Sequence, residues 1–356
     1  MNKRILIIGS QGYLGSRLSD YLFANGYDCT GLDTGFFQYG VLYRPKKLDM
    51  LEKDARTISE HDLEGYDVVV QLAAVANDPF ENLPIEAIYD PVRKYTIDIA
   101  RLCKKLGVRY LFPSSCAVYG IGQGELDEDG PTNPQSPYSI NKLQVEQDLT
   151  RLADASFSPI ALRLATVFGT SPRIRFDVVI NMLCGMAVTQ REVVLNSDGQ
   201  AWRPHLDIED ACEAFRCCID WDYDGGSLLV LNVGRNDNNW KIIDLARLIQ
   251  LKVDGCELRY LNASSDDGAN DLVKDRNILD GVDKRTYQVR FDRIAETLPG
   301  FVAQWDVARG IDRLLSELKL WCLNEGKFKQ RDFYRLQQME FLYHTQQIDD
   351  RLNWSR

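Results

Sequence analysis

The sequence predicts an α/β protein built on a doubly wound parallel sheet, and three features indicate this class. Short apolar runs, typical of strands buried on both faces, alternate with stretches of helical periodicity through residues 5–168. A glycine-rich turn joins the first strand to the first helix, and the second strand ends on an acidic residue. The chain has 356 residues, beyond the roughly 250 to 300 at which one hydrophobic core stops growing. We therefore expect a smaller C-terminal lobe beside the sheet.

The first predicted unit, residues 5–33, has the form of a βαβ half that binds a dinucleotide. Gly9 permits a tight turn, Gly12 lets the backbone approach a pyrophosphate, and Gly15 lets the helix pack on the strand. Such a turn alone is weak evidence, but here strand, turn, helix, second strand and acid follow in order. The unit predicts a Rossmann-type cofactor site that includes Gly9, Gln11, Gly12, Tyr13, Leu14, Gly15 and Asp33.

Asp33 indicates which dinucleotide is bound. Its carboxylate is placed to accept hydrogen bonds from the adenosine ribose hydroxyls. A 2′-phosphate would be repelled by this charge, and no Arg or Lys follows within residues 34–41. The sequence therefore favours NAD over NADP.

The next elements place small and polar residues at the carboxyl edge of the sheet, where ligands bind in open parallel sheets. A third strand is expected to end at residues 48–50, where Asp49 either reaches the adenine or caps the following turn. A fourth strand, 66–72, leads to small residues that allow close approach of a ligand. The cofactor contacts expected here are Asp49, Met50, Leu72, Ala73 and Ala74, and Asn77 is expected to contact the substrate.

The second half of the sheet follows the same alternation. Helical spacing over 85–106 leads to a fifth strand, 108–112, which we expect Pro113 to end because proline cannot donate to a sheet. Further on we expect a loop over 121–137, a helix from about Tyr138, strands at 160–164, 193–195 and 228–233, and helices at 177–187, 208–219, 242–251 and 307–318.

These elements predict a division into two lobes and an extension. Residues 1–168 and 202–240 are expected to form the NAD-binding Rossmann domain. Residues 169–201 and 241–325 are expected to form the smaller, substrate-binding lobe. Residues 326–356 are rich in Arg, Gln and aromatics, and we expect a helical extension docked on its own chain or on a partner subunit.

Composition excludes several classes of protein. The net charge of −10 argues against a nucleic-acid-binding surface. No apolar run approaches 18 residues and the start runs straight into the first strand, so no membrane contact and a cytoplasmic location are expected. Nine scattered cysteines suit reduced core thiols, and because the three histidines are isolated we expect no catalytic metal.

Tyr138 and Lys142 are the candidate catalytic pair. Their spacing places a phenol and an ammonium on one helix face. A tyrosine base at neutral pH must lose about three units from a pKa near 10, roughly 4 kcal/mol, which a nearby cation helps to supply. Tyr43 and Lys47 share the spacing, but Pro45 between them prevents the same helical face. The alternative is that Tyr138 and Lys142 are only an exposed pair on a helix. The decisive feature is that they follow the fifth strand, with Ser115 at the end of that strand.

Together these residues resemble the extended short-chain dehydrogenase/reductase family, specifically its nucleotide-sugar epimerase and dehydratase branch. The likeness spans about residues 3 to 320. The motifs that carry it are Gly9-x-x-Gly12-x-x-Gly15, Asp33, Leu72-Ala73-Ala74, Ser114-Ser115-x-x-Val118-Tyr119-Gly120, Tyr138-x-x-x-Lys142 and Arg203.

The resemblance implies roles for these residues. Tyr138 would take the proton of a sugar hydroxyl while hydride passes to the nicotinamide. Lys142 would hold the ribose and lower the pKa of the tyrosine, and Ser115 would hydrogen-bond the same sugar oxygen. Ser114, Tyr138 and Lys142 would also contact the cofactor. Relatives commonly pair through the helices that here begin near Ile85 and Tyr138, so a homodimer is expected.

The resemblance also implies a second lobe that grips a nucleoside diphosphate. Arg203 matches the family's diphosphate-binding arginine in position, whereas Arg175 and Arg285 are candidates from charge and loop placement alone. Each could equally be a surface arginine. Thr166 stands where many relatives have an Asn that touches the diphosphate. The substrate-binding set is Asn77, Ser115, Thr166, Arg175, Asp177, Arg203 and Arg285.

Departures from the family pattern narrow the reaction. Similar 4,6-dehydratases carry Asp-Glu where this chain has Cys116 and Ala117, so elimination of water is not expected. Decarboxylation and 3,5-epimerisation lose support for the same reason. The leading interpretation is a nucleotide-sugar 4-epimerase, with a net 4-dehydrogenase or 4-ketoreductase as the close alternative. A sensor or scaffold that binds NAD without turnover is the remote alternative.

Overall fold

A computed structural model describes residues 3–74, 85–260 and 285–355 of the chain. Its centre is a seven-stranded sheet in the order β11-β7-β5-β4-β1-β2-β3, with every neighbouring pair parallel. The strand order reverses between β1 and β4, which is where parallel sheets of this kind bind ligands. The strands are β1 (Arg4–Ile8), β2 (Asp28–Asp33), β3 (Asp49–Glu52), β4 (Val68–Gln71), β5 (Arg109–Ser115), β7 (Ile160–Leu164) and β11 (Leu229–Val233). The predicted doubly wound α/β class is confirmed.

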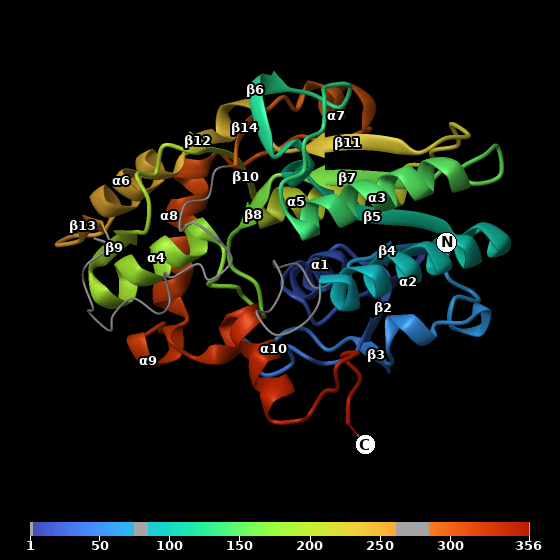
Figure 1. Ribbon diagram of the computed structural model, residues 1–356, viewed down its shortest axis with the longest axis horizontal. Coiled ribbons are helices and arrows are strands. Elements are labelled where there is room, and N and C mark those ends of the chain that lie inside the picture. The colour runs from blue at the N-terminus through green and yellow to red at the C-terminus, as the bar shows by residue number, and fades with distance from the viewer. Residues whose placement is uncertain (1–2, 75–84, 261–284, 356) are drawn as a thin grey trace.

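The alternating directions of the β1 side chains explain why helices cover both faces of this sheet. Successive side chains of a strand point to opposite faces, so a strand that is apolar throughout needs cover on each. Ile5 and Ile7 pack into a cluster with residues of α1 and α5, whereas Leu6 and Ile8 pack into a second cluster with residues of α2 and α3. α2 and α3 lie side by side in Figure 1. These helices are α1 (Tyr13–Ala24), α2 (Ile85–Leu106), α3 (Pro137–Leu152) and α5 (Ile208–Asp220).

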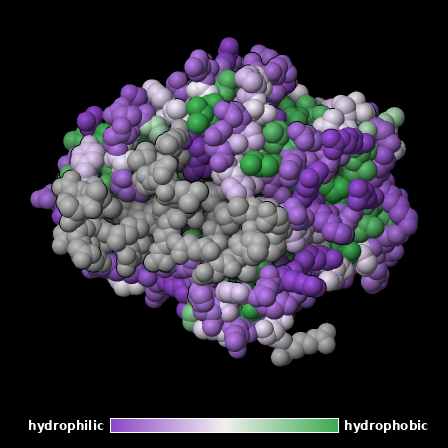
Figure 2. All heavy atoms as spheres, viewed as in Figure 1, coloured by the Kyte–Doolittle hydropathy of each residue, from purple (hydrophilic) through white to green (hydrophobic). Residues whose placement is uncertain are grey.

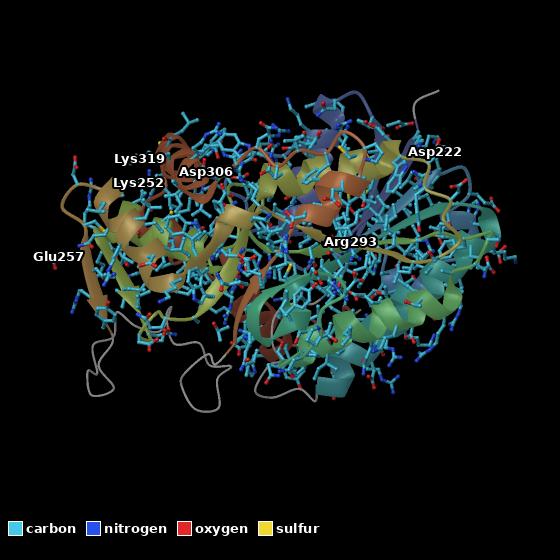
Figure 3. The ribbon with its side chains drawn as sticks, turned by 90° about the horizontal axis from the view of Figure 1, so that it is seen from above. Asp222, Lys252, Glu257, Arg293, Asp306 and Lys319 are labelled. Atoms are coloured by element: carbon cyan, nitrogen blue, oxygen red, sulfur yellow. The ribbon has the colours of Figure 1, made fainter. Side chains whose placement is uncertain are left out.

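The second region combines small sheets with three longer helices. β10 pairs with β8 and β12, β9 pairs with β13, and β6 pairs with β14. Lys252 of α6 forms an ion pair with Asp312 of α8 at 2.6 Å. Lys252 and Glu257 lie at one end of the molecule, and Asp222 lies at the other (Figure 3). These elements are β6 (Ile121–Leu126), β8 (Thr166–Phe168), β9 (Glu192–Leu195), β10 (Trp202–Asp207), β12 (Asn239–Lys241), β13 (Glu257–Tyr260), β14 (Thr286–Val289), α4 (Val179–Gln190), α6 (Ile242–Lys252), α7 (Asp292–Thr297) and α8 (Val307–Leu320).

Four details differ from the prediction. β3 ends at Glu52 and not at residue 50, and residues 121–137 contain strand β6. β5 continues through Pro113 to Ser115. Beyond Leu111 it pairs only with β7, so the backbone N–H that Pro113 lacks breaks no hydrogen bond to β4. β10 lies in a small sheet, although residues from 202 on were grouped with the cofactor domain. The division into lobes at the predicted boundaries stays a prediction.

The C-terminal extension packs on its own chain. Its helices are α9 (Glu325–Phe328) and α10 (Arg335–His344), and Gln338 of α10 donates to the carbonyl oxygen of Phe36 in the loop after β2. Phe328 is fully buried and its ring contacts Phe176 edge to face, with the ring centroids 4.9 Å apart. The extension is therefore part of the folded core rather than an appendage.

The face of the molecule drawn in Figure 2 is mostly polar. Figure 2 shows hydrophilic residues over most of the coloured face, with hydrophobic residues in small scattered groups. No helix within the described ranges is both long and apolar enough to span a bilayer. All nine cysteines fall in the described part of the chain and are free thiols: seven are buried, Cys29 is half-buried and Cys322 is exposed.

Candidate active site

The turn between β1 and α1 makes room for a ligand because its key positions are glycine. Gly9 has a φ of 88°, in the left-handed region, and a Cβ there would lie 2.5 Å from the backbone nitrogen of Ala73. A Cβ at Gly15 would lie 2.1 Å from the carbonyl oxygen of Gly9. Gly12 occupies the N-cap of α1 and has no side chain to accept from the first helical N–H groups. These groups can instead bind an anion such as a pyrophosphate.

Asp33 lies beside this turn, at the carboxyl end of β2. Its Oδ2 accepts from the backbone N–H of Gln11 at 2.8 Å, and its Oδ1 accepts from the N–H of Gly35 at 2.9 Å. Burial raises the pKa of this carboxyl group above its ordinary value, although both N–H groups oppose the shift. A carboxylate has about four lone-pair positions, so two remain for ribose hydroxyls. The glycine turn and Asp33 together fit the diphosphate and adenosine ribose of NAD.

A cavity of about 130 Å³ extends from this turn along the carboxyl edge of the sheet. Residues 53–56 line it beside β3, whereas Asp49 and Met50, which were expected to contact the cofactor, do not line it. Asp49 pairs with Thr30, well before the end of β2, and Met50 accepts a contact from Ser10 Oγ at 3.5 Å. The predicted contacts that do line the cavity are Gly9, Gly12, Asp33, Leu72, Ala73 and Ala74. The cavity is also lined by Arg351 and Leu352 of the C-terminal extension.

The side chains of Tyr13 and Leu14 make contacts inside the protein. The Tyr13 hydroxyl donates to the Gly169 carbonyl at 2.8 Å and accepts from Asn181 Nδ2 at 3.2 Å. Burial raises the pKa of this phenol far above its ordinary value, so it stays protonated. Leu14 packs against the main core. The phenol of Tyr13 therefore ties α1 to the second region, and the predicted cofactor contact of this residue stays a prediction.

Tyr138 and Lys142 lie on one face of α3, at the carboxyl end of β5. Ser136 caps this helix and fixes where its first turn begins. Lys142 Nζ lies 5.6 Å from the centre of the Tyr138 ring and 4.5 Å from that of Phe112. It also donates to the carbonyl oxygen of Pro113 at 2.6 Å. The proline that was expected to end β5 instead anchors the ammonium group beside the phenol.

Ser114 and Ser115 end β5 with their side chains in different surroundings. Ser115 is half-buried, and its Oγ accepts from the N–H of Ala117 at 3.1 Å, which leaves its own proton to donate. Ser114 is buried, and its hydroxyl donates to Glu146 of α3. The Ser114 side chain therefore joins β5 to α3, and the predicted cofactor contact of this residue stays a prediction.

The pKa of Lys142 is strongly lowered. Burial disfavours its charged form and lowers the pKa from the ordinary 10.5 to about 7, although Glu146 acts in the opposite direction. The group therefore changes charge near neutral pH, where a proton-transfer partner is most useful.

Glu146 and Arg163 form a buried ion pair that sequence reasoning missed. Arg163 Nη2 lies 2.7 Å from Glu146 Oε2, and both side chains are almost fully buried. Arg163 also donates to the Tyr119 hydroxyl at 3.0 Å. The pair joins α3 to β7 and so fixes the helix that carries Tyr138 and Lys142. Glu146 lies one turn beyond Lys142 on the same face, which was the only available signal.

Arg175 and Asp177 form a half-buried ion pair near the candidate base. Arg175 Nε lies 2.7 Å from Asp177 Oδ1. Burial opposes the charge of Arg175, but Asp177 outweighs this, with Tyr138 contributing, and the pKa of the guanidinium is raised. Asp177 also accepts from the backbone N–H of Arg335, a residue of the extension that the sequence did not single out. The structure thus brings this pair into electrostatic reach of Tyr138.

The other predicted substrate residues lie farther along the second region. Arg203 is buried, donates to the carbonyl oxygen of Arg285, and lies 5.3 Å from the centre of the Tyr287 ring. The two arginines are therefore neighbours. Thr166 begins β8 and pairs with His205 of β10, in the same small sheet. Asn77 lies outside the described residues.

Comparison with known proteins identifies related chains. A family model described as the NAD dependent epimerase/dehydratase family matches residues 5–234.

Solved structures share the fold at low sequence identity. One is MoeE5 in complex with UDP-glucuronic acid and NAD, with a TM-score of 0.72 and 22% identity, covering 89% of this chain and 99% of that one. A second is TunA, an NAD-dependent NDP-hexosamine 5,6-dehydratase of tunicamycin biosynthesis, with a TM-score of 0.70 and 22% identity over 89% and 97% of the chains. A third is UDP-glucuronic acid 4-epimerase from Bacillus cereus, with a TM-score of 0.69 and 21% identity over 89% and 99%.

Proposed function

The chain belongs to the NAD-dependent epimerase/dehydratase family, and from this membership we propose that it is a nucleotide-sugar 4-epimerase. NAD is the cofactor of this family, and the glycine turn with Asp33 fits it. The observation that carries the proposal is the placement of Lys142 Nζ 5.6 Å from the Tyr138 ring, at the edge of the sheet that bears the cofactor turn. A phenol with an adjacent cation is suited to remove a proton from a sugar hydroxyl.

Each residue has a defined task in the proposed reaction. Bound NAD supplies hydride acceptance and return at the sugar carbon. Tyr138 removes the proton of the C4 hydroxyl and later gives it back, and the ammonium of Lys142 favours the phenolate. Ser115 donates to the same sugar oxygen through its free hydroxyl proton. An epimerase returns the hydride to the opposite face, so the sugar leaves with no net oxidation.

Cys116 and Ala117 support epimerisation over dehydration. Elimination of water needs an acid and a base near the neighbouring carbons. Cys116 is buried, its thiol donates to the carbonyl of Arg163 at 3.1 Å, and burial raises the pKa of the thiol far above neutrality. Ala117 carries no proton to transfer. Neither residue of this turn can therefore replace a carboxylate pair.

Arg203 and Arg285 are the proposed contacts for the diphosphate, together with Thr166. Guanidinium groups suit bidentate recognition of phosphate oxygens. Arg175 and Asp177, near Tyr138, are proposed to contact the sugar. A homodimer in the cytoplasm completes the proposal.

The test is incubation of the purified protein with UDP-, dTDP-, GDP- and ADP-sugars. We expect interconversion of two C4 epimers by NMR, with no lasting rise in absorbance near ~340 nm. A lasting rise would identify net 4-dehydrogenation, and consumption of NADH with a 4-keto sugar would identify a 4-ketoreductase. A protein that binds NAD but converts none of these sugars would contradict the proposal and favour a sensor.

A further inference from the structure

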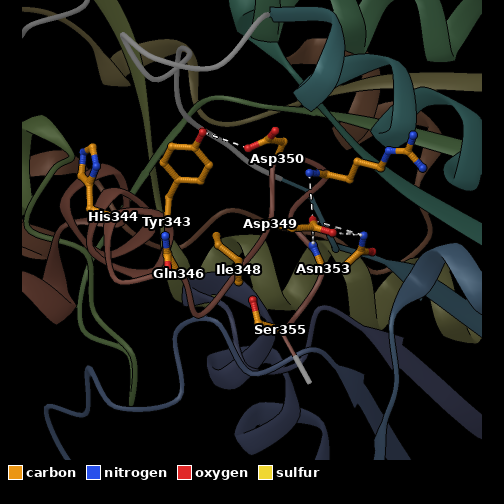
Figure 4. Close-up of a pocket in the computed structure, with 9 residues that line it drawn as sticks. Tyr343, His344, Gln346, Ile348, Asp349, Asp350, Asn353 and Ser355 are labelled. Atoms are coloured by element: carbon orange, nitrogen blue, oxygen red, sulfur yellow. Dashed lines mark hydrogen bonds between the residues drawn. The ribbon is translucent and has the colours of Figure 1, made fainter.

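Residues 347–355, here named the C-terminal hook, form a compact turn after α10. Ile348 and Trp354 form an antiparallel bridge, and the Ser355 N–H donates to the Gln347 carbonyl at 2.8 Å. Asp349 closes the turn by accepting from the backbone N–H groups of Arg351 and Asn353 at 2.9 and 2.8 Å (Figure 4). The hook therefore has a defined shape of its own.

The hook is fastened to the loops that follow β2 and β3. Arg56 donates to the carbonyl oxygens of Arg351 and Leu352, the latter at 2.9 Å. The indole N–H of Trp354 donates to the carbonyl of Thr34 at 2.7 Å, and its ring lies 5.3 Å from that of Phe36. Thr34 directly follows Asp33, so the hook is attached at the residue next to the ribose-binding carboxylate.

Helix α10 also contacts the loop after β2. Gln338 Nε2 donates to the carbonyl of Phe36 at 3.1 Å, and the Arg335 guanidinium lies 4.2 Å from the centre of the Phe37 ring. Arg335 also acts electrostatically on Asp33 and partly offsets the rise in its pKa. Both α10 and the hook therefore hold the loop after β2.

Leu352 brings the hook into the cofactor cavity itself. It is buried, has a φ of 56° that is unusual for a bulky residue, and lines the same cavity as Gly12 and Asp33. Its side chain also belongs to an apolar cluster with Met339 and Leu342 of α10. A ligand that fills this cavity contacts Leu352, and the anchored hook lies across the adenosine end.

We propose that the hook is the outer wall of the adenosine half of the NAD site and that it controls cofactor exchange. NAD leaves only when the contacts of Arg56 to the hook and of Trp354 to the loop after β2 are broken, so the cofactor is retained through many turnovers. This inference rests on NAD binding in the proposed site, but not on which sugar reacts. Retention suits a reaction in which the hydride is returned within each cycle.

Trp354→Ala tests the proposal because Trp354 fastens the hook without lining the cavity. The protein is loaded with radiolabelled NAD and chased with excess unlabelled NAD. We expect release at least about tenfold faster than from the unchanged protein, since loss of such contacts acts mainly on dissociation. Trp221→Ala is the matched control, because Trp221 packs on Tyr223 at the end of α5. Equal release rates for Trp354→Ala and the unchanged protein would overturn the proposal.

Hydrogen exchange on the unchanged protein gives a second test that needs no variant. Coupling between two sites is reciprocal, so a hook that retains NAD must itself be held by NAD. We expect slower exchange of the backbone N–H groups of residues 347–355 when NAD is added, and identical exchange would contradict the inference. NAD binding without conversion of any nucleotide sugar would overturn the proposed function alone.

Discussion

Tyr138 is the residue on which the proposed chemistry depends. Its neighbour Lys142 is held by the Pro113 carbonyl, so the distance between ammonium and phenol is set by β5 and α3 together. Phenylalanine keeps the ring and its packing while removing the proton acceptor.

Tyr138→Phe is expected to lower kcat by about 10² to 10⁴, the usual contribution of a general base, with little change in thermal stability. Tyr223→Phe is the control, because it removes an exposed hydroxyl that lies 3.3 Å from Ser227 Oγ. Turnover and NAD binding are measured for both variants. A Tyr138→Phe variant with normal turnover would exclude the proposed base.

Lys142 predicts a distinct dependence of stability on pH. The folded protein releases this proton near pH 7, whereas the unfolded chain keeps it to about 10.5. Between these values the unfolded state binds more protons, so the contribution of Lys142 to the free energy of unfolding becomes more favourable as pH rises. This contribution to the free energy of unfolding changes by at most about 1.4 kcal/mol per pH unit.

Lys142→Met isolates this contribution, because it keeps a side chain of similar length without a titrating group. Unfolding by denaturant is measured for both proteins from pH 7 to 10. We expect the free energy of unfolding of the unchanged protein, minus that of Lys142→Met, to increase with pH. A difference independent of pH would show that the ammonium is not buried as described.

At the scale of elements, the glycine turn of β1 and α1 sets both packing and cofactor binding. Gly15→Ala places a methyl group 2.1 Å from the Gly9 carbonyl oxygen, so the turn must shift. We expect NAD binding, measured by calorimetry, to weaken at least tenfold, about 1.4 kcal/mol. Gly326→Ala is the matched control, since its nearest contact is Asn324 Oδ1 at an ordinary 3.4 Å. Equal NAD affinity for both variants would contradict this account of the turn.

The elements were largely predictable because their signals are local. The βαβ unit of residues 5–33 and the limits of α2 follow from periodicity and glycine stops. The end of β5 was predicted wrongly at Pro113, because whether a strand tolerates a proline depends on which neighbouring strand still pairs at that position. The end of β3 was misplaced for a similar reason, since its register is set by β2.

Residues of the candidate site could be predicted to lie together only where their spacing along a single helix or strand places them together. Tyr138 and Lys142 share a helix, so their proximity follows from the sequence. The ion pair of Glu146 with Arg163 joins distant segments, and its only signal in the sequence was the position of Glu146 one turn beyond Lys142. No local pattern signals Arg351 and Leu352, which reach the cofactor cavity from the far end of the chain.

At the scale of the whole molecule, the C-terminal extension is bound into the core of the second region. Phe328 is fully buried, and a Cβ at Gly185 of α4 would lie only 2.3 Å from its ring. Phe328→Ala is expected to lower the free energy of unfolding by about 3 to 5 kcal/mol, because it leaves a large cavity. Leu320→Ala, at a position 70% exposed, is expected to change it by no more than about 0.5 kcal/mol. Denaturant titration of both variants provides the measurement, and a small loss for Phe328→Ala would show that the extension is not packed in this way.

The exposure of Cys322 has a practical consequence for single-molecule and fluorescence work. Seven of the other thiols are enclosed, Cys29 is partly covered, and burial raises the pKa of the Cys29 thiol as well. A maleimide dye should therefore attach at Cys322 in the native chain, with no need to remove the remaining cysteines.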